Sequence, residues 1–168
     1  MTSTPPVHPA ITDRAAQPYA GIKRTVTMNT IPEIADRIPQ LIGWLAARGI
    51  APAGAPFLKY NVIDMDRELQ MEAGVPVAEQ ITGDGDVFGA VLPAGRYVTV
   101  THRGHPSELE GVTGAVLAWA EQQGLRWDTT ATPDGERWTA RLELYHTNPM
   151  EQPDMSQWQT ELAFRLAD

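Results

Sequence analysis

The stretch TIPEIADRIPQLIGWLAARGI at residues 30–50 is followed, 75 residues later, by HPSELEGVTGAVLAWAEQQGL at residues 105–125. At this offset the two stretches align without a gap, and three residues of the first align with the same residue type in the second: Glu33, Trp44 and Gly49. A tryptophan and a glycine that recur at one fixed offset are hard to obtain by chance, and such self-similarity is the mark of an internal repeat. The sequence therefore predicts two similar units in tandem.

Both stretches have the pattern of an amphipathic helix, with apolar residues at helical spacing. In the first, Thr30 and Glu33 predict a capping box at the helix start, and Pro39 predicts a kink. Gly49 and Gly124 predict the two helix ends, because glycine readily adopts the left-handed conformation found there.

The segments around each helix alternate as strands do. The expected strands are residues 20–27, 56–64 and 68–77 in the first unit, and 95–102, 136–147 and 159–167 in the second. FLKYNVID at residue 57 also resembles LELYHTNP at residue 142, which aligns Tyr60 with Tyr145 at an offset of 85. We expect an α+β fold of two strand–helix–strand–strand units about a pseudo-two-fold axis. Its sheet should be mainly antiparallel, with two long helices and a central ligand groove.

Length and composition indicate one domain. Residues 1–10 are polar and proline-rich and are expected to be a flexible tail. Residues 11–168 are expected to form the domain, with unit one at about 11–78 and unit two at about 87–168.

The net charge of −8 disfavours direct nucleic-acid binding, which needs a basic surface. The chain has no cysteine, which excludes disulfides and thiol chemistry. No apolar run approaches a membrane span or a signal peptide, so a cytoplasmic location is expected. No motif predicts a cofactor, and His102 and His105, at a strand-to-helix turn, predict no metal site. The oligomeric state is left open.

Several segments together resemble the GyrI-like small-molecule-binding domain, which is also the effector-binding half of many AraC-type and MerR-type bacterial regulators. They are MEAGVPV (71–77), PAGRY (93–97), LELYHTNP (142–149), QPD (152–154) and WQTEL (158–162). The resemblance covers roughly residues 11–167 and implies a ligand groove between the two units. Family regulators carry a helix-turn-helix segment outside this domain. We expect none here, because only about ten polar residues precede the first expected strand.

Strand alternation alone puts Glu143 on the face opposite the apolar one. That face is either solvated, with an Arg141–Glu143 ion pair, or part of a cleft. The resemblance favours the cleft, because Glu143 matches a buried glutamate that lies among aromatic residues in the family. The expected ligand-binding residues are Glu143, Tyr60, Tyr145, Tyr97, Trp44 and Trp158. Each aromatic one has the alternative of an ordinary core or half-buried position.

Three functions fit these residues. The first is binding or sequestering a hydrophobic aromatic ligand, cationic ones included, as multidrug-binding proteins do. The second, by resemblance to some family members, is hydrolysis of the cyclopropane of DNA-alkylating natural products as toxin resistance. Glu143 would then activate water, and a tyrosine, either Tyr60 or Tyr145, would donate a hydrogen bond, with Tyr145 taken as the catalytic candidate. The third is interaction with a protein partner such as gyrase.

Overall fold

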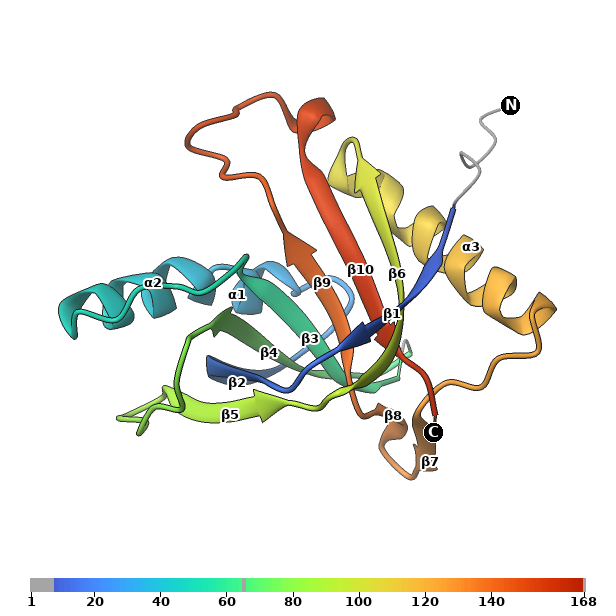
Figure 1. Ribbon diagram of the computed structural model, residues 1–168, viewed down its shortest axis with the longest axis horizontal. Coiled ribbons are helices and arrows are strands. Elements are labelled where there is room, and N and C mark those ends of the chain that lie inside the picture. Colours follow the sequence, from blue (N-terminus) through green and yellow to red (C-terminus); the bar gives the residue numbers. More distant parts are fainter. Residues whose placement is uncertain (1–7, 65, 168) are drawn as a thin grey trace.

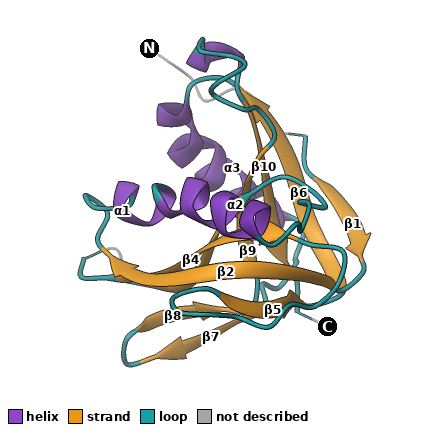
Figure 2. Cartoon of the chain, turned by 90° about the vertical axis from the view of Figure 1, so that its left-hand side faces the viewer, coloured by secondary structure: helices purple, strands orange, loops and turns teal. Residues whose placement is uncertain are grey.

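The computed structural model describes residues 8–64 and 66–167, and within them ten strands form one curled antiparallel sheet with helices on one face (Figures 1 and 2). The strands are β1 (Ala10–Arg14), β2 (Gln17–Val26), β3 (Phe57–Ile63), β4 (Leu69–Pro76), β5 (Phe88–Leu92), β6 (Gly95–Arg103), β7 (Thr129–Thr132), β8 (Gly135–Trp138), β9 (Arg141–Tyr145) and β10 (Gln159–Arg165). The helices are α1 (Pro32–Ala35), α2 (Arg37–Ala47) and α3 (Leu109–Gln122), with 3-10 turns η1 (Pro106–Glu108) and η2 (Met155–Gln157).

The strand order β1-β6-β10-β9-β3-β4-β2-β5 reads the same from both ends once repeat equivalents are matched. β3 corresponds to β9, β4 to β10 and β2 to β6, and the central pair β3–β9 is antiparallel. This arrangement is that of two units related by a pseudo-two-fold axis between β3 and β9. The predicted α+β fold with duplicated units is therefore confirmed.

Each unit also has an edge strand that the sequence did not reveal. β1 pairs with β6 of the second unit, and β5 pairs with β2 of the first. Each edge strand thus lies against the other unit, which ties the two repeats together (Figure 1). Of the predicted tail, residues 1–7 lie outside the described residues, and Ala10 begins β1.

The first helix is interrupted, and its start differs from the prediction. Asp36 separates α1 from α2, because the Pro39 ring lacks an N–H and its bulk conflicts with the carbonyl four residues earlier. The capping box is wrong: the hydroxyl of Thr30 accepts from the Thr27 N–H, and Glu33 pairs with Arg24. The helix ends are as expected.

The predicted strand over residues 136–147 divides into β8 and β9 at Thr139 and Ala140. The break changes which face each side chain occupies. Trp138 packs under α3 with Phe164, whereas Leu142 lies in the cluster on the opposite face of the sheet. Unbroken alternation from residue 136 to residue 147 would put Trp138 and Leu142 on one face, and that expectation is therefore wrong.

Both faces of the central strands are buried. On β3, Leu58 packs in the apolar cluster beneath α1 and α2, while the adjacent Phe57 packs in the cluster on the other face. A third cluster lies beneath α3. A polar side chain that projects from β3 or β9 toward the helices therefore lies between the apolar cluster beneath α1 and α2 and the apolar cluster beneath α3.

Candidate functional site

Glu143 lies beside the pseudo-two-fold axis. Leu58 and Glu143 are paired across β3 and β9, and they are also repeat equivalents at the offset of 85. Tyr60 and Tyr145 each lie two residues further along their strands, so they project from the same face as Glu143. The symmetry places one tyrosine on each side of the carboxyl group.

Both tyrosine hydroxyls donate hydrogen bonds to this carboxyl group. The Tyr145 hydroxyl lies 2.7 Å from Oε1 of Glu143, and the Tyr60 hydroxyl lies 3.2 Å from Oε2. Burial raises the pKa of Glu143 above its usual 4.5, opposed by the hydrogen bonds from Tyr145 and Tyr60 and by nearby Arg141. Burial and the neighbouring carboxyl also raise the pKa of both tyrosines, which stay protonated donors.

A cavity of about 620 Å³, the first cavity, lies between β3, β9, β10 and α3. Glu143, Tyr60 and Arg141 form its polar wall, and Phe164 forms part of its apolar wall. Its volume is within the range of small-molecule sites, which are largely apolar with a few placed polar groups. The arrangement suits a flat apolar ligand with one polar or charged group directed at Glu143.

A second cavity, of about 860 Å³, lies between α1, α2 and the loop from β9 to β10. The repeat relates it to the first cavity, because four helix residues that line the one differ by 75 from four that line the other. These pairs are Ala35 and Glu110, Ile38 and Thr113, Pro39 and Gly114, and Ile42 and Leu117. The structure thus has two cavities with similar frames and different linings.

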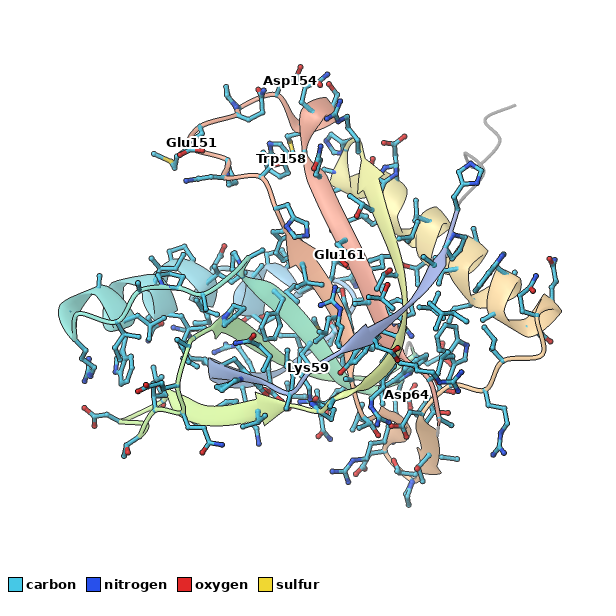
Figure 3. All side chains as sticks on the ribbon, viewed as in Figure 1. Lys59, Asp64, Glu151, Asp154, Trp158 and Glu161 are labelled. Carbon is cyan, nitrogen blue, oxygen red and sulfur yellow. The ribbon has the colours of Figure 1, made fainter. Side chains whose placement is uncertain are left out.

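Tyr145 connects the two cavities, because it lines the second while its hydroxyl bonds to Glu143 in the first. Trp158 lines the second cavity as well, at the start of β10 (Figure 3). Its indole N–H donates to the Gln152 carbonyl at 2.7 Å, which holds the ring in place below the loop.

The other two expected aromatic residues lie away from these cavities. Tyr97 is 1% exposed in the cluster on the opposite face of the sheet, and its hydroxyl donates to the Pro93 carbonyl. Trp44 packs at the edge of the α2 cluster, with the Arg48 guanidinium 3.7 Å from its ring centre. Both have the ordinary structural positions that strand and helix periodicity left open for them.

The sequence did not identify Glu72, a carboxylate that is more deeply buried than Glu143. It accepts hydrogen bonds from the Tyr19 hydroxyl and the Asn61 amide, and Lys59 (labelled in Figure 3) lies 3.4 Å away. Glu72, Asn61 and Lys59 border a polar cavity of about 790 Å³, and none of its lining residues belongs to a helix. The available signal was a charged residue within the otherwise apolar run MEAGVPV.

Arg141 also occupies a position that the sequence did not predict. It is buried, so the solvated outer face considered for β9 is not observed. Among the described residues no ion pair joins it to Glu143. Its guanidinium lies instead among the rings of Phe164, Trp138 and Tyr60.

In the part of the chain that the structure describes, no group of three or more His, Asp or Glu side chains could hold a metal ion. His102 bonds to Glu108, and His105 bonds to Ser107, which places the two rings in separate local contacts.

No helix of the described residues is long and apolar enough to cross a membrane.

Solved structures with this fold include three proteins of interest. EcmrR in a complex with DNA has a TM-score of 0.76 at 18% identity, over 97% of this chain and 58% of EcmrR. The EcmrR C-terminal domain alone gives 0.71 at 18% identity, over 96% of this chain and 98% of that domain. This chain thus spans a little over half of the EcmrR chain in the DNA complex.

SAV2435 bound to tetraphenylphosphonium has a TM-score of 0.59 at 17% identity, with 95% of this chain and 94% of that one covered. A hydrolase from Listeria innocua gives 0.60 at 14% identity, with 95% and 91% covered. At these identities the likeness establishes the fold alone. A comparison with curated protein sequences found no match.

The family model of the GyrI-like small molecule binding domain matches residues 8–167, which is nearly the whole chain. That match agrees with the duplicated α+β fold. The chain belongs to the GyrI-like small-molecule-binding domain family.

Proposed function

We propose that the protein binds a hydrophobic aromatic small molecule in the first cavity, with Glu143 as the group that fixes its polar or cationic end. The observation that carries the proposal is a partly buried carboxyl group at the wall of a cavity of about 620 Å³, bonded by two tyrosine hydroxyls. Burial of a carboxyl is unfavourable unless it is compensated. A group kept there at such a cost is a good candidate for ligand recognition.

The aromatic surfaces support the same proposal. Tyr60 and Phe164 line the cavity with flat rings, against which an aromatic ligand packs. A cation over such a ring gains roughly 0.5–2 kcal/mol, and the ionised Glu143 adds a counter-charge. The family of this chain is described as small-molecule-binding. Its structural neighbour SAV2435 was solved with the aromatic cation tetraphenylphosphonium.

The proposal extends to the second cavity through Tyr145 and Trp158. The repeat equivalents of Glu143 and Arg141 are Leu58 and Pro56, of which Pro56 lines the second cavity, so this frame lacks both charges. We therefore assign it the uncharged aromatic part of a ligand, packed against the Trp158 ring. Replacing Trp158 with Ala should weaken ligands that have several aromatic rings and leave single-ring ligands unchanged.

Titration calorimetry with tetraphenylphosphonium is the direct test. Wild-type protein should bind, and Glu143→Gln should bind about tenfold or more weakly, because a buried charge-assisted contact is lost. Glu121→Gln is the matched control, since Glu121 is exposed on α3 outside the cavities. Equal affinity of wild type and Glu143→Gln would contradict the assignment of Glu143.

Hydrolysis of a strained cyclopropane is a second candidate, favoured by the raised pKa of Glu143 next to two phenol donors. Glu143 would take a proton from water as the water oxygen bonds to a ring carbon. The breaking C–C bond would send its electron pair to a conjugated carbonyl oxygen, which would accept a hydrogen bond from Tyr145 and then take up the proton held by Glu143. Mass spectrometry should then show a product heavier by one water, absent with Glu143→Gln. Unchanged compound recovered in complex with the protein would favour binding alone.

A further inference from the structure

Arg141 is a buried cation to which the described residues offer no hydrogen-bond acceptor. It is 9% exposed, and its Nε is fully buried and unpaired. Within residues 8–64 and 66–167 its guanidinium makes no hydrogen bond and no ion pair. Buried donors in folded proteins are almost always satisfied, and a guanidinium has five of them. The side chain therefore lacks the partner that its burial requires.

Aromatic rings hold the guanidinium at the first cavity. Its central carbon lies 4.7 Å from the ring centre of Phe164, 4.8 Å from Trp138 and 5.6 Å from Tyr60. Such contacts engage the charge of the group and leave its N–H donors unused. Because Arg141 itself lines the cavity, those donors are available to a bound molecule.

The fold does not demand an arginine at this place. The repeat equivalent of Arg141, at the offset of 85, is Pro56, which lines the second cavity. The same frame thus forms a cavity wall without a cation. An arginine is therefore present in the wall of the first cavity and absent from that of the second, as expected of a residue that determines ligand specificity.

The surrounding charges narrow the class of ligand. Glu143, Glu136 and Glu110 also line the first cavity, so an anionic ligand would meet more negative than positive charge. Glu136 already accepts a hydrogen bond from the Trp138 indole at 2.7 Å. A hydrocarbon cation would gain from Glu143 but would be repelled by the buried guanidinium. A neutral oxygen acceptor satisfies Arg141 without either conflict.

We propose that the first cavity selects aromatic ligands that carry a carbonyl or amide oxygen, to which Arg141 donates. The ligand's ring system lies against Tyr60 and Phe164, and any donor or positive group it has is directed toward Glu143. This inference rests on the proposed function, because it names the ligand class of the same cavity. It differs from that function in assigning selectivity to Arg141 rather than to the carboxyl group.

The test uses naphthalene-2-carboxamide and naphthalene-2-carboxamidine, which have nearly the same shape. The amide offers a carbonyl oxygen, whereas the amidinium is a cation without an acceptor. Calorimetry compares wild type with Arg141→Met, which removes the charge and keeps the long stem. The amide should bind Arg141→Met about tenfold or more weakly, since a hydrogen bond from a charged donor is lost. The amidinium should bind it more tightly, since a repulsive charge is gone.

Two further variants serve as controls. Arg141→Lys retains the charge but not the planar guanidinium, and should bind the amide with intermediate affinity. Arg103→Met, at an exposed position at the end of β6, should change neither ligand. If Arg141→Met fails to fold, Arg141→Lys alone must still weaken the amide.

The outcomes separate this inference from the proposed function. If tetraphenylphosphonium binds in a Glu143-dependent way but the amide does not bind, or binds Arg141→Met as well as wild type, the role of Arg141 is refuted and the proposed function stands. If neither naphthalene compound nor tetraphenylphosphonium binds wild type, both are refuted. Opposite changes for the two naphthalene compounds on Arg141→Met would support the inference.

Discussion

Replacing Glu143 with Gln should stabilise the folded protein at neutral pH. Gln has nearly the same shape as Glu, and its amide group can still meet both hydroxyls, accepting from Tyr145 at the 2.7 Å contact and donating to the oxygen of Tyr60. The substitution therefore removes a buried charge and little else. A group retained for ligand binding at the expense of stability should respond in this way.

The sign follows from the pKa of Glu143, which burial raises above the usual value of 4.5. The protonated carboxyl is favoured in the folded state, so its contribution to stability is complete below pH 4.5 and is lost as pH rises through the folded-state pKa. Each pH unit between the unfolded and folded pKa values corresponds to about 1.4 kcal/mol. We therefore expect Glu143→Gln to be more stable than wild type at pH 7, by about 1.4 kcal/mol for each pH unit by which the folded-state pKa exceeds the unfolded one.

Urea denaturation followed by tryptophan fluorescence, repeated between pH 4 and pH 8, measures this difference. The free energies of unfolding of the two proteins should coincide near pH 4 and diverge as pH rises. Glu121→Gln, at an exposed position, should stay within about 0.5 kcal/mol of wild type throughout. A Glu143→Gln variant that is clearly less stable than wild type at pH 7 would refute the reasoning. The carboxyl group would then be a structural anchor, and its burial would not indicate a ligand site.

Two other predictions concern the tyrosine pair and the repeated glycines. Tyr145→Phe should raise the pKa of Glu143 more than Tyr60→Phe does, because the Tyr145 hydrogen bond is the shorter and contributes more to lowering that pKa. Carbon-13 NMR titration of the Glu143 carboxyl measures the two pKa changes. Equal changes would contradict the unequal hydrogen-bond lengths. Gly49→Ala and Gly124→Ala should each lower the free energy of unfolding by about 1–2 kcal/mol, because both glycines have φ near +70° (68° and 71°). The two losses should add in the double variant, since an added Cβ meets no atom within 4 Å at either site. A clearly unequal or non-additive loss in urea denaturation would show that one site has tertiary contacts.

Much of the fold followed from local pattern. Helical spacing and terminal glycines located the helices, because both depend on backbone geometry within a few residues. The fixed offset revealed the duplication and hence the pseudo-two-fold axis. The edge strands β1 and β5 gave no such signal. β1 is largely exposed and β5 is half-buried, and both five-residue segments owe their structure to pairing with the other unit.

The composition of the site was suggested by the sequence, but its geometry was not. Glu143, Tyr60 and Tyr145 could be named as candidates from the repeat and the family resemblance. That both hydroxyls reach one carboxyl follows from the antiparallel pairing of β3 with β9, which joins segments 85 residues apart. Such long-range pairing has no local signature.

The tertiary structure alone decided which side chains the cavities use. Periodicity assigns a residue to a face, but burial and partners depend on what the rest of the chain places over that face. For this reason Tyr97 lies in the cluster on the face of the sheet opposite the helices, and Trp44 lies at the edge of the cluster beneath α2. For the same reason Arg141, which the sequence offered as one half of a surface ion pair, is a buried cation at the cavity wall.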